Sequence, residues 1–252
     1  MINPIQKLNP KLFDLNVERV PIRDGFGEGL VEAGEKNQQV VALCADLVES
    51  TRIEKFAKQF PERFVEIGVA EQNLVTVASG LAAMGKIPFT ASYACFSPGR
   101  NWEQIRTTIT YNDVPVKIVG AHAGISVGPD GGTHQMLEDL ALMRVLPNMV
   151  VVVPCDSVEA KKATLGIADN GKPSYIRLAR NKSAVVTTES SPFAIGKANV
   201  LIDPDYADVA VIACGQMVYY SLLAARQLEI EGIKVSVTNL HTIKPIDTET
   251  IH

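Results

Sequence analysis

The sequence has no hydrophobic run long enough to cross a membrane. Its longest apolar runs, at residues 40–45 and 149–153, are far shorter than the roughly 20 apolar residues that a transmembrane helix needs. The N-terminus also lacks the basic and then apolar segments of a secretory signal. Since 46% of the 252 residues are hydrophobic, the chain can still bury one large core or two modest ones. We therefore expect a soluble, globular and cytoplasmic protein.

The chain is also short of positive charge and of paired cysteines. Its 24 Lys and Arg are outnumbered by 28 Asp and Glu, a net charge of −4, so composition gives no electrostatic basis for binding nucleic acid or an anionic membrane. The four cysteines are scattered without the spacing of a metal site or a redox pair: Cys44, Cys95, Cys155 and Cys214. We expect reduced thiols, packed in the core except for Cys95, and no metal site formed by this chain.

Continuous apolar, β-branched runs alternate with helical patterns along the chain. The runs lie at residues 39–45, 86–92, 116–122, 149–154, 174–178, 209–214 and 234–240, and the helical patterns at 23–34, 71–84, 99–111, 135–146, 157–170 and 217–231. Continuous runs suit a parallel sheet covered on both faces, and the strand-helix order predicts a doubly wound α/β fold. In such folds ligands gather at the carboxyl ends of the strands, where Asp46, Tyr93, Phe96 and His122 follow their runs.

The chain divides into unequal units. We expect an N-terminal extension at residues 1–16, a large α/β domain at 17–186, a linker at 187–192 within a polar, Ser/Thr-rich stretch, and a second domain at 193–252. The second unit shows only two strand-like runs and one helical pattern before the sequence ends, shortly after a segment that should lead into further structure. We therefore expect the second domain to be incomplete.

The segment F-V-E-I-G-V-A-E-Q-N, residues 64–73, places a short apolar strand directly before a helix that opens with an acid. Apolar residues at 74, 77, 78, 81 and 82 have the spacing of one buried helical stripe, and Gly85 stands where a left-handed cap would end the helix. Glu71 would then lie at the helix start, aimed at a ligand. Alternatively it only complements the positive end of the helix dipole.

A glycine-rich loop at residues 122–135, H-A-G-I-S-V-G-P-D-G-G-T-H-Q, carries two of the four histidines of the chain, His122 and His134, together with Asp130. Glycines let the backbone approach a ligand closely, and the helix predicted at 135–146 would present its amide end nearby. The loop can also be read as a turn-rich connection capped by a histidine.

In their order, these motifs resemble those of transketolases. Arg23, C-A-D-L-V-E-S at 44–50, G-V-A-E at 68–71, S-Y-A-C-F-S at 92–97, the histidine loop and L-A-R-N at 178–181 follow one another as in that family. The match spans residues 17 to about 185, and the start of the family's C-terminal domain matches through residue 252. The resemblance implies a pyrimidine-binding domain that holds part of thiamine diphosphate, followed by the beginning of a C-terminal domain.

The resemblance also implies roles on the cofactor side of the site. Glu71 would share a proton with the pyrimidine ring nitrogen and so activate the cofactor, whose thiazolium carbon adds to a ketose and hands a two-carbon glycolaldehyde unit to an aldose. Phe96 would stack on the aminopyrimidine, with Tyr93 and Leu47 as apolar neighbours and Asp46 as a further contact. Phe96 has a plainer interpretation as a core residue. Where transketolases usually have a tyrosine, this chain has Gly99, so one wall of the pocket would be rebuilt.

On the substrate side, the family's phosphate clamp maps onto four residues: Arg23, Ser50, His122 and Arg180. Arginine suits phosphate because its planar fork makes paired, charge-assisted hydrogen bonds, although Arg23 and Arg180 taken singly read as surface ion-pair residues. Asp130 and His134 match residues that hold donor hydroxyls, and His134 would also assist proton transfer.

One motif of thiamine enzymes is missing. The G-D-G sequence followed some 25 residues later by Asn, which binds the diphosphate and its magnesium, does not occur in the chain. The divalent cation would then be held by a separate N-terminal subunit. By this interpretation the chain is the C-terminal half of a split transketolase, and we expect a symmetric assembly with two copies of each subunit.

Three other interpretations are compatible with parts of the sequence. A 1-deoxyxylulose-5-phosphate synthase shares G-x-A-E-Q and the D-G-x-T-H loop but usually has arginine where His122 stands. The β subunit of a 2-oxo-acid dehydrogenase is also a separate chain but does not normally carry D-G-x-T-H-Q. A non-catalytic regulatory homologue would keep the fold, although the retention of Glu71, Asp130, His134 and both arginines argues against loss of activity.

Overall fold

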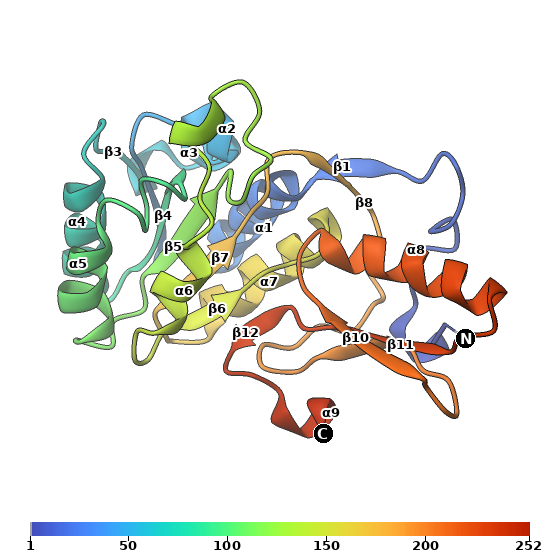
Figure 1. The fold of residues 1–252 in the computed structure, drawn as a ribbon. Coiled ribbons are helices and arrows are strands. Elements are labelled where there is room, and N and C mark those ends of the chain that lie inside the picture. Colours follow the sequence, from blue (N-terminus) through green and yellow to red (C-terminus); the bar gives the residue numbers. More distant parts are fainter. Residues whose placement is uncertain (1) are drawn as a thin grey trace.

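A seven-stranded sheet forms the centre of the computed structural model, which describes residues 2–252 (Figure 1). Its order is β12 (Thr242–Lys244), β6 (Val150–Val152), β7 (Ser174–Arg177), β5 (Lys117–Ala121), β4 (Ile87–Tyr93), β2 (Val40–Cys44) and β3 (Phe64–Glu66). All neighbours run parallel except β12, which is antiparallel to β6. Every residue of β2 and β5 is buried, as a sheet covered on both faces requires. The predicted doubly wound α/β fold is confirmed.

Helices cover both faces of this sheet. On one face α1 (Ile22–Lys36) packs against α7 (Ser157–Asp169), and their apolar sides share a core with the sheet. The two helices can approach closely because Gly25 has no side chain: a Cβ there would lie only 1.7 Å from the Ser157 carbonyl oxygen. The other face carries α4 (Glu71–Ala83), α5 (Trp102–Gln104), the π-helical η3 (Ile105–Thr110) and α6 (Asp139–Arg144).

The short elements complete the first unit. They are α2 (Val48–Thr51) and α3 (Glu54–Gln59), which had no clear sequence pattern, together with the 3-10 turns η2 (Pro61–Arg63) and η4 (Gly131–Thr133). A further 3-10 turn, η1 (Pro4–Gln6), lies in the N-terminal segment and contacts β9 (Asn199–Ile202). A two-stranded ribbon pairs β1 (Arg19–Pro21) with β8 (Lys182–Ala184) in antiparallel fashion. Within residues 2–252, no helix is both long and apolar enough to cross a membrane.

Three of the predicted helices begin or end at other residues than expected. Helix α1 continues through Gly34 to Lys36, because that glycine serves packing: a Cβ there would lie 2.6 Å from the Phe56 ring. The helix predicted at 99–111 begins only at Trp102, after a series of hydrogen-bonded turns. The helix predicted at 135–146 is shortened to Asp139–Arg144, because the backbone of Met136 is hydrogen-bonded to Gly124 across the loop and is not available to a helix.

The second unit contains a three-stranded sheet in the order β10 (Val209–Ala213), β11 (Val235–Asn239) and β9 (Asn199–Ile202). Helix α8 (Met217–Ile230) packs on it, α9 (Thr248–Ile251) lies near the C-terminal end, and β12 leaves this unit to join the edge of the large sheet (Figure 1). The N-terminal segment also belongs here, since Leu12 and Val17 are buried in the same core as α8. The two units therefore exchange segments: the N-terminal segment packs in the core of the second unit, and β12 from the second unit pairs with the large sheet.

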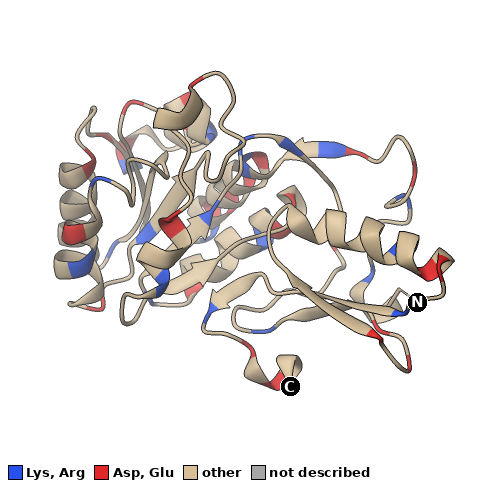
Figure 2. Cartoon of the chain, in the orientation of Figure 1, with Lys and Arg blue, Asp and Glu red and all other residues tan. Residues whose placement is uncertain are grey.

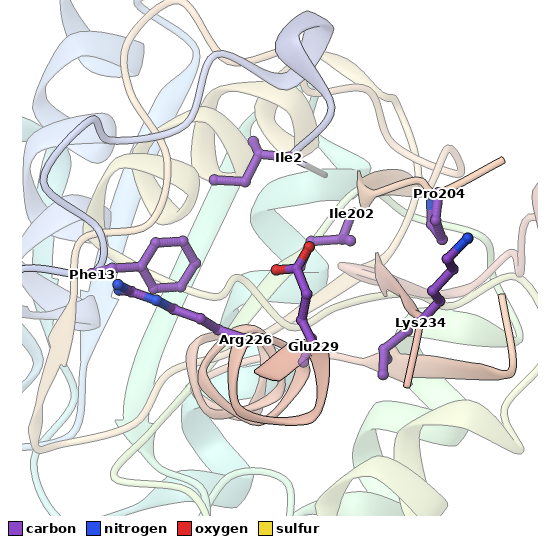
Figure 3. Close-up of a pocket in the computed structure, with 9 residues that line it drawn as sticks. Ile2, Phe13, Ile202, Pro204, Arg226, Glu229 and Lys234 are labelled. Atoms are coloured by element: carbon purple, nitrogen blue, oxygen red, sulfur yellow. The ribbon is translucent and has the colours of Figure 1, made fainter. Parts of the chain in front are cut away.

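A small cavity of about 210 Å³ lies where the N-terminal segment meets the second unit. Phe13 from the N-terminal segment and Arg226 from α8 line it (Figure 3), with the guanidinium carbon 4.9 Å from the centre of the Phe13 ring.

Acidic and basic residues are interspersed along the chain rather than gathered on one element (Figure 2), in keeping with the small net charge.

Candidate active site

The Glu71 carboxylate is buried at the start of α4. Its residue is only 3% exposed, and within residues 2–252 the carboxylate accepts no hydrogen bond; its near neighbour is Arg100, with 3.8 Å between Oε2 and Nη1. The corner before the helix is held by Glu66, whose Oε1 accepts hydrogen bonds of 2.8 Å from the backbone amides of Asp46 and Gly68. The structure thus places a buried carboxylate beside Arg100 with no hydrogen bond to it inside the described residues.

Four rings meet at the carboxyl ends of β4 and β5. Tyr93 and His122 stack with 3.9 Å between ring centres, and Tyr93 and Phe96 are nearly parallel at 6.1 Å. The edge of His134 meets Phe96 at 5.3 Å and 80°. The structure therefore brings together four predicted site residues from two strand ends and the glycine-rich loop, in the place where an α/β sheet binds its ligands.

A cationic group lies next to these rings. The Arg23 guanidinium donates to Nε2 of His122 over 3.1 Å. Burial, followed by the charge of Arg23, lowers the pKa of His122 to about 3, so the ring is neutral at physiological pH and must carry its proton on Nδ1. That Nδ1 and the Nε of Arg23 are buried without a partner inside residues 2–252. Two unsatisfied buried donors are costly and suit a site that receives an acceptor-rich ligand.

The glycine-rich loop is shaped around arginines. Gly128 has φ of +90°, a conformation that favours glycine, and a Cβ there would lie 2.3 Å from Nη1 of Arg180, so the loop backbone packs directly on this guanidinium. Arg180 also contributes to the lowered pKa of His122, which places its charge near the ring. Arg23, His122 and Arg180, three of the four residues predicted to clamp a phosphate, therefore lie in one electropositive group.

The remaining predicted residues lie around this centre. Asp46 is exposed at the end of β2 with φ of +56°, Leu47 is half-buried and Ser50 lies on α2. Asp130 is exposed before η4. The side chains of Asp46, Ser50 and Asp130 make no hydrogen bond within the described residues, so the structure does not draw them into the ring cluster.

Several residues at the site had no signal in the sequence. Arg100 approaches Glu71, and the fully buried Asn101 donates to the Glu71 carbonyl oxygen over 2.8 Å. Arg52 pairs with Asp24 at 2.7 Å and helps to lower the pKa of Arg23, after the larger effect of burial. These contacts depend on how turns close, which residue patterns do not reveal.

No group of three or more His, Cys, Asp or Glu side chains within residues 2–252 is arranged to hold a metal ion. Of the two cysteines nearest the site, Cys44 is buried and Cys95 is half-buried. Burial raises the pKa of Cys44 and of Cys95 to about 11, so neither thiol ionises readily at neutral pH. The chemistry that the arrangement offers is that of one buried carboxylate, an aromatic wall and a cationic cluster.

Comparison with known proteins agrees with this arrangement. Residues 18–184 match the transketolase pyrimidine-binding domain, and residues 196–252 match the transketolase C-terminal domain. A provisionally named transketolase C-terminal section from Methanocaldococcus jannaschii is 45% identical over 91% of the chain and 73% of its own length. A 6-deoxy-6-sulfo-D-fructose transketolase subunit from Clostridium sp. is 40% identical over 95% of the chain and 74% of its own length.

A solved structure described as "Split gene transketolase, inactive beta4 tetramer" is 44% identical and superposes with a TM-score of 0.84, covering 92% of this chain and 74% of that one. The matched domain includes Glu71, the ring cluster and the cationic group. The chain therefore belongs to the transketolase family.

Proposed function

We propose that the chain is the C-terminal subunit of a split transketolase, which transfers a two-carbon glycolaldehyde unit from a ketose phosphate to an aldose phosphate with thiamine diphosphate. The observation that carries this proposal is the Glu71 carboxylate, buried at a helix start with no hydrogen bond to any part of residues 2–252. Burying a polar group without hydrogen bonds is costly, so a carboxylate in this state suits a ligand that supplies hydrogen-bond donors.

The residues present fit the pyrimidine half of thiamine diphosphate. When bound, the cofactor supplies a nucleophilic carbon that adds to a ketose carbonyl and accepts the electrons released when the neighbouring carbon–carbon bond breaks. Glu71 would exchange a proton with the pyrimidine ring nitrogen. Phe96 would stack on the ring, Tyr93 and Leu47 would pack beside it, and Asp46 would add a polar contact at the rim.

The cationic group would bind the sugar phosphate. Arg23 and Arg180 supply guanidinium donors, and neutral His122 offers a third donor through Nδ1, which has no partner among the described residues. Ser50 would complete the clamp from α2. Asp130 and His134, on the loop that faces the rings, would hold donor hydroxyls, and His134 would assist proton transfer.

The diphosphate and its magnesium would be held by a separate N-terminal subunit. Two observations support this part of the proposal: the relatives named above are themselves a C-terminal section and a subunit, and the diphosphate motif does not occur in this sequence. We expect two copies of each chain, with the catalytic site between subunits, and a cytoplasmic location.

The experiment is to tag this chain, recover it with its partner from the native lysate, and measure transfer from xylulose 5-phosphate to ribose 5-phosphate with magnesium and thiamine diphosphate. We expect transfer that depends on the cofactor and on a partner carrying the missing motif. Transfer by this chain alone would refute the split enzyme. A partnered complex that shows no transfer from xylulose 5-phosphate but accepts pyruvate or another donor would refute the transketolase assignment and leave the fold assignment standing.

A further inference from the structure

The turn between β4 and α5 closes so tightly that it fixes the position of Arg100. The Gly99 amide donates to the Ala94 carbonyl over 3.1 Å, and the Arg100 amide donates to the Phe96 carbonyl over 2.9 Å. A Cβ on Gly99 would lie 2.0 Å from the Cys95 carbonyl oxygen, which no side chain tolerates. The turn therefore requires glycine at position 99, where the family usually has a tyrosine, and it sets the backbone position of Arg100.

Asn101 ties the turn to the start of α4. This residue is fully buried, and its Nδ2 donates both to the Glu71 carbonyl oxygen over 2.8 Å and to Ser97 Oγ over 3.1 Å. The amide therefore links the backbone of Glu71 to the turn that presents Arg100. Because buried hydrogen bonds to backbone are costly to break, the two segments are held as one unit.

The charges of the two side chains complement each other without a hydrogen bond. The Glu71 side chain is 3% exposed and the Arg100 side chain 62% exposed, with 3.8 Å between Oε2 and Nη1. Within residues 2–252, Arg100 is the one cation within 4 Å of this carboxylate. A separation of 3.8 Å is too long for a hydrogen bond, so the arginine balances the buried charge while the acceptor positions of the carboxylate stay open.

We propose that Arg100 is a positioning residue that pairs with Glu71 without occupying its hydrogen-bond acceptor positions, which stay open for the aminopyrimidine of thiamine diphosphate. This inference rests on the proposed function, because it assigns the ligand of Glu71. Arg100 itself lies outside the clamp formed by Arg23, His122 and Arg180 and acts through the carboxylate.

The test is the affinity of the recovered complex for thiamine diphosphate with magnesium, measured by titration calorimetry without sugar substrates. We expect Arg100→Met to weaken binding about fivefold, a size that reflects one partly screened ion pair. Arg100→Lys keeps the charge and should stay within about twofold of the natural protein. Arg106→Met is the matched control, since Arg106 is an exposed arginine of the next helical segment, near Trp102 and not near Glu71, and it should leave the affinity unchanged.

A double-mutant cycle separates positioning from a general structural effect. In the Glu71→Gln background there is no charge to balance, so adding Arg100→Met should cause no further loss of affinity. An equal fivefold loss in both backgrounds, or no loss in either, would overturn the inference. Should the melting temperature of Arg100→Met fall, Arg100→Gln repeats the cycle with a polar side chain.

The outcome is distinguishable from that of the proposed function. If the natural complex binds thiamine diphosphate but transfers no glycolaldehyde unit, the function fails while the cycle still decides the role of Arg100. If it transfers and the cycle shows additive losses, the function stands and Arg100 is only a structural residue.

Discussion

Asp156 should be among the most stabilising polar residues of the chain. It caps α7 by accepting the Glu159 amide over 2.8 Å. Its other oxygen accepts the amides of Val186 and Thr187 over 2.7 and 2.6 Å, and the Thr187 hydroxyl donates to the same group over 2.9 Å. The residue is fully buried, and it joins the first unit to the segment that leads into the second.

Replacing Asp156 with Ala removes the cap and leaves three further donors without an acceptor. A cap contributes about 1 kcal/mol, and each buried donor left unsatisfied costs about 1 kcal/mol or more, so we expect a loss of about 4 kcal/mol in the free energy of unfolding. Asp156→Asn keeps one acceptor oxygen and should lose about half as much. Urea denaturation of the isolated chain measures both values from the midpoint and slope.

Asp203→Ala is the control, because Asp203 is exposed in the loop after β9, and it should change the free energy of unfolding by less than about 0.5 kcal/mol. A loss below about 1 kcal/mol for Asp156→Ala would refute the reasoning, since it would mean that water or a rearranged backbone satisfies these donors as well as the carboxylate does.

Two further predictions concern helix packing and the His122 ring. Gly25→Ala should lower the free energy of unfolding by about 3 kcal/mol, because the new Cβ would overlap the Ser157 carbonyl oxygen. Gly80→Ala is the control: no atom lies within 4 Å of its new Cβ, so it should be neutral or stabilise by up to about 1 kcal/mol. Equal effects of the two substitutions in urea denaturation would contradict this packing. His122, with its folded-state pKa lowered to about 3, should stay neutral at pH 5 in nitrogen-15 NMR with the proton on Nδ1. Its contribution to stability should be lost as pH falls from about 6.5 toward 3, because protons then bind the unfolded chain first; a ring that titrates near 6.5 would contradict the burial described.

The elements with long, regular patterns could be predicted from sequence. Strand β2 and helix α4 begin and end within a residue or so of the expected positions, because their side chains are apolar throughout or at helical spacing. The gathering of Tyr93, Phe96 and His122 also followed, since parallel strands end at one edge of a sheet.

What could not be predicted depended on contacts between distant segments. Gly34 reads as a helix stop, yet its missing side chain makes room for Phe56. Asp139 lies inside a predicted helix, but it starts a shorter one, fully buried and bonded to Tyr175 and Arg177 from β7. Arg100 lies near Glu71 because the turn between β4 and α5 closes tightly, and the local sequence pattern did not predict that turn.

The most direct test of the account is the transfer rate of the recovered complex with Glu71→Gln, which keeps the shape of the side chain and removes its ability to exchange a proton. We predict that kcat for transfer from xylulose 5-phosphate to ribose 5-phosphate falls at least about 100-fold. Glu103→Gln, an exposed acid on α5, should keep the natural rate. A Glu71→Gln complex that transfers at more than about half the natural rate would contradict the claim that this buried carboxylate drives the reaction.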